Sequence, residues 1–87
     1  MRIRIHADQR IYSGTPTEVV QQMHEQAFAA QHLSLSDYVD WAAGMAREML
    51  GIHLQITGDT AELKAASLVQ AMLEQGLADK LEPELIH

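Results

Sequence analysis

The chain of 87 residues contains no cysteine. This absence excludes disulfide bonds, thiolate nucleophiles and zinc sites built from cysteine, and it fits a reducing compartment. The segment Met1–His6 alternates charged and apolar residues, so it lacks the continuous apolar stretch of a signal peptide. No segment approaches the ~20 apolar residues of a membrane span. We therefore expect a cytoplasmic protein with no membrane contact.

Sequence motifs for nucleotide chemistry and acyl transfer are also missing. The 5 glycines are scattered without the spacing of a dinucleotide fingerprint or a phosphate loop. The serines do not form the Gly-x-Ser-x-Gly turn of a hydrolase nucleophile. The sequence thus predicts no catalytic residue, no cofactor and no enzymatic activity.

A metal site requires several ligands to converge, and the 5 histidines are poorly spaced for this. His24 and His32 lie two helical turns apart and point in different directions. We therefore predict no metal site. An approach of His53 to Asp59 or to the first helix would be the exception, and it keeps a small metal-dependent or hydrolytic enzyme as a distant alternative.

Acidic residues outnumber basic ones, giving a net charge of −6 that is unevenly distributed. Residues 1–14 carry +2 because Arg2, Arg4 and Arg10 outweigh Asp8, and the 3 cations and 11 acids of the remainder give −8. Nucleic-acid affinity comes largely from neutralising phosphates, so the sign of the whole chain disfavours nucleic acid as a partner.

Local patterns define the first elements of the chain. Residues 2–6 alternate, and residues 10–13 are rich in β-branched and aromatic side chains, which together predict a hairpin. Thr15 and Glu18 form a capping box that opens a helix. The apolar positions of this helix continue to about Gln31.

The second half of the chain shows the same alternation of patterns. A helix over residues 35–50 ends at Gly51, the residue best able to adopt a positive φ. Residues 52–56 alternate apolar and polar side chains, which predicts a strand with one buried face. A last helix follows from a cap at Asp59 to Gly76.

These elements predict a small single α+β domain with the order ββααβα. An N-terminal β-hairpin and a third strand would pack against three helices. We place the domain at residues 1–76, and residues 77–87 form a C-terminal tail that is at most partly ordered.

The helix over residues 35–50 carries more apolar surface than one small core usually covers. Beside its main apolar stripe, a second stripe is formed by Tyr38, Trp41 and Met45. Either this stripe is covered within the monomer or it is an interface with a partner. Because a chain of this size buries a modest fraction of its surface, a dimer would add stability.

Two segments resemble the helices of ribbon-helix-helix repressors and antitoxins. Residues 17–20 open one helix, and residues 33–39 open the next with a Ser-x-Ser-acid-aromatic-Val turn that is common in that family. The resemblance implies an obligate dimer in which a strand pairs with its twin and places alternate polar residues, here Arg2, Arg4 and His6, in the DNA major groove. An apparent second strand before the first helix departs from that pattern.

The sequence therefore predicts a non-enzymatic, acidic protein-interaction or regulatory module. We expect a homodimer whose contact surface is the apolar second helix, with another protein as a further partner. The alternative is a DNA-binding regulator or antitoxin of the ribbon-helix-helix type.

Overall fold

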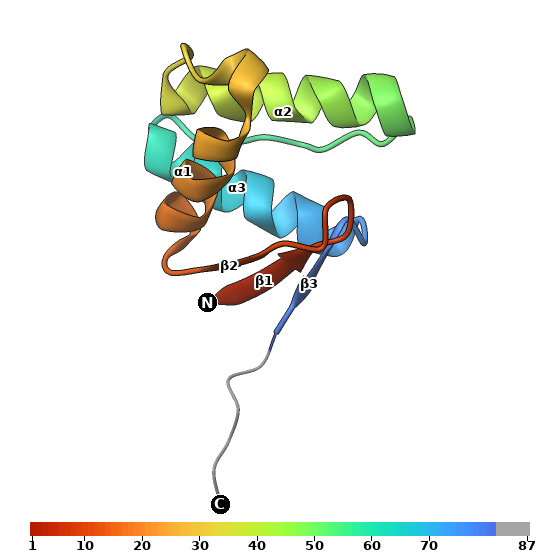
Figure 1. Ribbon diagram of the computed structural model, residues 1–87. Coiled ribbons are helices and arrows are strands. Elements are labelled where there is room, and N and C mark those ends of the chain that lie inside the picture. Colours follow the sequence, from red (N-terminus) through yellow and green to blue (C-terminus); the bar gives the residue numbers. More distant parts are fainter. Residues whose placement is uncertain (82–87) are drawn as a thin grey trace, which may run out of the picture.

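A computed structural model describes residues 1–81 and shows an antiparallel sheet of three strands and three helices packed on one side of it in two layers (Figure 1). The α+β class, the N-terminal hairpin and the packing of a third strand with three helices are confirmed. In chain order the elements are β1 (Arg2–Ile5), β2 (Ile11–Ser13), α1 (Pro16–Gln26), the 3₁₀ turn η1 (Phe28–Ala30), α2 (Leu35–Leu50), α3 (Ala61–Glu74) and β3 (Ala78–Lys80).

The sheet has the order β2-β1-β3, so the first strand lies in the centre. Ile3 pairs with Tyr12 on β2 and with Lys80 on β3. Ile3, Ile5 and Tyr12 are buried beneath the helices, whereas Arg2 lies exposed on the alternating face. Period-2 alternation therefore gives the sheet one apolar face and one polar face.

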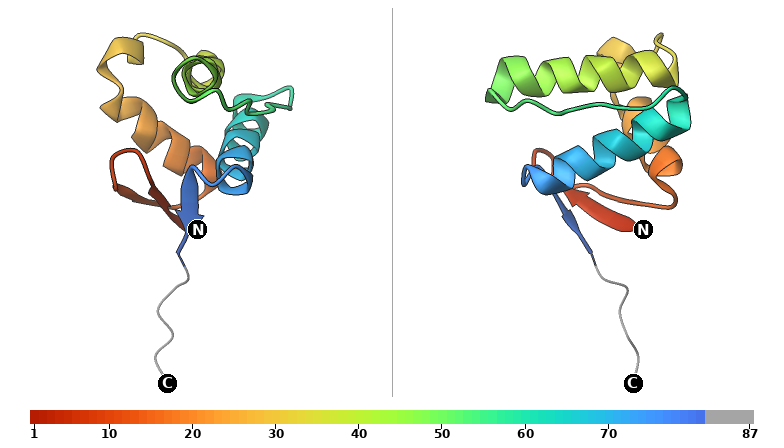
Figure 2. Two further views of the ribbon diagram at one scale, coloured as in Figure 1. Left: turned by 90° about the vertical axis from the view of Figure 1, so that its right-hand side faces the viewer. Right: turned by 180° about the vertical axis from the view of Figure 1, so that it is seen from behind.

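The molecule is built in layers, which Figure 2 shows from two sides. Helices α1 and α3 lie on the sheet, and α2 crosses above them as the element farthest from the sheet. The core between these layers is apolar; its fully buried larger side chains are Ile3, Val19, Val20, Val39, Leu68 and Val69. Because α2 rests on two helices rather than on the sheet, its C-terminal half extends past α1 (Figure 1).

The helix starts follow local capping chemistry. The Thr15 hydroxyl accepts a hydrogen bond from the Glu18 amide at 3.2 Å, and the Glu18 carboxylate accepts one from the Thr15 amide at 2.9 Å, which confirms the predicted capping box. These hydrogen bonds hold the pKa of the exposed Glu18 carboxyl below its ordinary value. The cap of α3 is Thr60 rather than the predicted Asp59, since the Thr60 hydroxyl accepts from the Leu63 amide at 3.2 Å.

The predicted strand over residues 52–56 is wrong. This segment has no regular secondary structure and joins α2 to α3. Its alternation still has a physical role, because Leu54 is only 5% exposed and packs into the core. The Ser67 hydroxyl on α3 anchors the segment: it accepts from the Thr57 amide at 2.8 Å and donates to the Gln55 carbonyl at 3.1 Å. An alternating pattern thus produced a buried face without a paired strand.

The third strand forms instead at Ala78–Lys80, within the segment predicted as a tail. β3 pairs antiparallel with β1, and the Leu81 amide donates to the Arg2 carbonyl at 2.8 Å just beyond it. The structured domain therefore continues past Gly76. The rest of the predicted tail, residues 82–87, lies outside the described residues.

Candidate functional site: an apolar groove under the second helix

The structure divides the predicted stripe of α2 into a core residue and two groove residues. Tyr38 is 4% exposed and belongs to the core. Its ring stacks on His24 at a centroid distance of 4.6 Å and on Trp41 at 5.8 Å. Burial, with additional repulsion from Tyr12 and Asp8, raises the pKa of Tyr38 to about 12. Tyr38 therefore packs against Trp41 from within the core and is not accessible to a partner.

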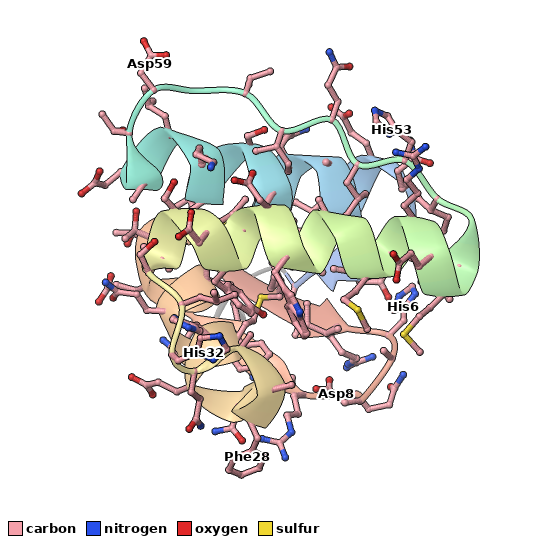
Figure 3. The ribbon with its side chains drawn as sticks, turned by 90° about the horizontal axis from the view of Figure 1, so that it is seen from above. His6, Asp8, Phe28, His32, His53 and Asp59 are labelled. Carbon is pink, nitrogen blue, oxygen red and sulfur yellow. The ribbon has the colours of Figure 1, made fainter. Side chains whose placement is uncertain are left out.

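Trp41 and Met45 are half-buried and line an open groove with a volume of about 490 Å³. The C-terminal half of α2 forms one wall, and the N-terminal hairpin faces it. Side chains of α3, including Leu68 and Met72, also line the groove. In Figure 3, His6 of the hairpin lies close to the C-terminal end of α2. The groove exists because this part of α2 extends past α1.

Methionine and leucine each contribute 4 residues to the lining of the groove. Of the 5 methionines in the chain, 4 line it: Met23, Met45, Met49 and Met72. We call this feature the methionine groove. Unbranched thioether side chains adapt to irregular apolar shapes and make favourable contacts with aromatic rings. The groove therefore presents an adaptable apolar surface.

The end of α2 leaves apolar surface in water beside the groove. Met49 is 71% exposed and Leu50 is 58% exposed. Both belong to the last turn of α2, which Gly51 ends with φ +67°. Among the lining residues in the described part of the chain, His6 has the most polar side chain, and its Nε2 lies 2.7 Å from the Asp79 carboxylate. The groove thus lacks the several convergent polar groups that fix a small polar ligand.

The residues assigned to DNA contact in the alternative interpretation lie on β1. Arg2 is exposed and Arg4 is half-buried, on the same face of the strand, while His6 follows β1 and faces Asp79. Both edges of β1 are occupied, by β2 and by β3 of the same chain. A twin strand therefore has no free edge on β1, and the two-stranded ribbon of the ribbon-helix-helix arrangement does not form there.

The histidines do not converge within residues 1–81. His24 Nε2 lies 2.8 Å from the Ala30 carbonyl, which gives it a structural role. Figure 3 shows His53 and Asp59 at opposite ends of the segment that joins α2 to α3. The described part of the chain contains no group of three metal-ligating side chains. A second, polar hollow contains His53 and Ser67, but the Ser67 hydroxyl is already engaged by the backbone of residues 55 and 57.

The sequence predicts the residues on the α2 side of the methionine groove but not the residues of the opposite walls. The contributions of Ile5, Ala7 and Leu77 depend on contacts between segments far apart in the chain. Met49 could have been found from the sequence, because it continues the spacing of Trp41 and Met45 along α2.

Comparison of the chain with protein-family models, curated proteins and solved structures finds no match in any of the three. Within the described residues, no helix combines the length and apolar character needed to cross a membrane.

Proposed function

We propose that this chain is a non-enzymatic protein-interaction module that forms a homodimer through the methionine groove and the end of α2. The observation that carries the proposal is the exposure of Met49 and Leu50 beside a groove lined almost wholly by apolar side chains. Surface of this kind commonly marks a protein–protein contact. The cysteine-free sequence supports a cytoplasmic location for the module.

Energetics favour a protein partner for this surface. Removing apolar surface from water contributes about 25 cal/mol for each Å², so covering ~200 Å² on each copy contributes on the order of 10 kcal/mol for the pair before the cost of association. The net charge of −6 on each copy opposes self-association at long range. Added salt screens that repulsion, and dimerisation should strengthen modestly as ionic strength rises.

The mass of the protein in solution tests the proposal. Light scattering across micromolar to high-micromolar concentrations should give twice the chain mass of 9.7 kDa. Met49→Glu should shift the protein to the monomer, because it places a charge on the proposed contact surface. Met49 itself is 71% exposed in the single chain, so the substitution should leave the fold intact. Leu63→Glu is the matched control, since Leu63 is 55% exposed but belongs to α3 and does not line the groove.

A parent protein that stays at the monomer mass throughout this range would overturn the proposed homodimer. Equal effects of Met49→Glu and Leu63→Glu would place the contact elsewhere. A second protein that binds the same surface should compete with dimerisation, so its binding should also be lost in Met49→Glu.

A further inference from the structure

Phe28 is the one phenylalanine of the chain, and it is 85% exposed. Figure 3 shows its ring projecting away from the body of the protein. Aromatic side chains are enriched at protein–protein interfaces, so an exposed ring is a candidate contact for a partner. The fold of the single chain leaves the ring of Phe28 uncovered.

The backbone around Phe28 is fixed, and it holds the ring outward. Helix α1 was predicted to continue to about Gln31, but it ends at Gln26, and Ala27 adopts φ −96° and ψ 84°. The turn η1 follows, and Ala30 at its end is fully buried. Because the turn is anchored in the core, Phe28 protrudes from a defined position.

Side-chain hydrogen bonds stabilise this break in the helix. His24 Nε2 lies 2.8 Å from the Ala30 carbonyl. The Gln31 side-chain amide donates to the Glu25 carbonyl at 2.7 Å, closing a free end of α1. These hydrogen bonds stabilise the interruption of the helix, and this interruption places Phe28 on the surface.

The methionine groove has the size and chemistry to receive this ring. Its volume of about 490 Å³ lies within the range of pockets that bind drug-sized ligands, which leaves room for one aromatic ring. The sulfur atoms of Met45 and Met49 would meet the ring, and methionine–aromatic contacts are favourable. Phe28 points away from its own chain and does not line its own groove, so its ring is available to a second molecule.

We propose that Phe28 of one copy inserts into the methionine groove of a second copy, and that the second copy does the same in return. This inference rests on the proposed homodimer and names its central contact. A reciprocal arrangement is the closed, two-fold form that most homodimers adopt.

Estimated contact area agrees with a dimer of this geometry. An aromatic side chain buries ~150 to 250 Å², and the groove walls that enclose it lose a comparable area. Each copy contributes one ring and one groove, and the exposed Met49 and Leu50 belong to the groove walls. The ring and the walls of one copy together bury ~300 to 500 Å², and a polar rim around them brings the contact toward the ~800 Å² per partner of a standard interface.

Substitution of Phe28 tests the contact by its effect on dimerisation. Phe28→Ala should raise the dimer dissociation constant at least ~30-fold, as expected for a central aromatic residue, whereas Leu63→Ala, an exposed leucine outside the groove, should leave it within ~3-fold. Phe28→Leu should restore part of the affinity. Circular dichroism should be unchanged, because Phe28 makes little contact within its own chain.

Disulfide cross-linking tests the reciprocal geometry of the proposed dimer. The chain has no natural cysteine, so only the introduced cysteines can form a disulfide. Phe28→Cys and Met49→Cys are prepared as separate variants and then mixed under mild oxidation. The mixture should give a disulfide-linked pair containing one chain of each variant. Each variant alone should give little linked product, because the reciprocal contact brings position 28 to position 49 and not to itself.

The outcomes separate this inference from the proposed function. A parent protein that is dimeric, together with a dimeric Phe28→Ala of unchanged affinity, would overturn the Phe28 contact and leave the homodimer standing. A monomeric parent would overturn both. A concentration-dependent ladder of larger assemblies would show head-to-tail contacts and so overturn the reciprocal geometry.

Discussion

Tyr38 lies where the core meets the methionine groove, and its ionisation should govern stability at alkaline pH. The pKa of Tyr38 is raised from 10.0 to about 12, chiefly because burial disfavours the phenolate. The folded protein therefore holds this proton more tightly than the unfolded chain does. The stability that this proton contributes is complete below pH 10 and is lost as the pH rises from 10 toward 12.

Replacing Tyr38 by phenylalanine should remove that pH dependence. We expect the free energy of unfolding of the parent to fall more steeply above pH 10 than that of Tyr38→Phe, measured by urea denaturation. Both proteins keep Tyr12, whose pKa is also raised by burial, so the difference between them reports the ionisation of Tyr38 together with its repulsion of Tyr12. Parallel curves for the two proteins over this pH range would show that Tyr38 ionises freely in the folded state.

Two glycines bound the segment between α2 and α3, and their surroundings differ. Gly51 has φ +67°, and a Cβ at this position would meet no atom within 4 Å. Gly58 has φ +116°, and a Cβ there would lie 2.5 Å from the Leu63 Cβ and 3.0 Å from the Leu63 backbone carbon. Conformational strain acts at both positions, but steric overlap acts only at Gly58.

Alanine substitution should therefore separate the two glycines. Gly51→Ala should cost ~1 kcal/mol, the penalty of left-handed backbone for a residue with a Cβ, and Gly58→Ala should cost more than ~2 kcal/mol because the start of α3 must also shift. Thermal unfolding of the two variants beside the parent measures both values. A smaller loss of stability for Gly58→Ala than for Gly51→Ala would mean that Leu63 can move away from the added Cβ at little energetic cost.

Elements whose ends are set by local chemistry were predictable from the sequence. The capping box at Thr15 and the left-handed glycine that ends α2 need only neighbouring residues. The strand β3 was not predictable in this way, because Ala78–Lys80 shows no alternation and forms by pairing with β1. The strand prediction over residues 52–56 was wrong for the opposite reason. Alternation of apolar and polar residues indicates a buried face, but it does not indicate a neighbouring strand that provides hydrogen bonds.

The candidate site was predictable to a similar extent. Helical spacing correctly grouped Trp41 with Met45, but the same spacing included Tyr38, which is buried against His24 of α1. The sequence could not indicate that the hairpin and α3 form the facing walls, because that depends on how the layers cross. The break after Gln26 was equally hidden, since the apolar periodicity continues through it.

At the scale of the whole molecule, dimerisation can be followed by the fluorescence of a tryptophan in the groove. Trp41 is the one tryptophan and lines the groove, so its emission should report whether the groove is filled. We expect emission that is blue-shifted in the dimer and red-shifts on dilution to the monomer. Trp41→Ala should weaken association by about 2 kcal/mol, as interface aromatic residues often do.

The Phe28→Ala variant is the control for this measurement, and its emission should stay at the red-shifted position up to concentrations at least ~30-fold higher than in the parent. Trp41 emission that stays constant while the mass doubles would place the dimer contact away from the groove. A Trp41→Ala variant that remains dimeric but melts earlier would assign Trp41 to the monomer core.

The central position of β1 has a consequence for how the chain is made. β1 leaves the ribosome before the other elements described here, and β3, which closes its second edge, follows only after α1, α2 and α3 have been synthesised. Throughout that interval β1 presents an open row of backbone donors and acceptors, a known route to aggregation between nascent chains. The arginines that alternate along β1 place positive charge beside this open edge, and such charge disfavours pairing with another copy before β3 arrives.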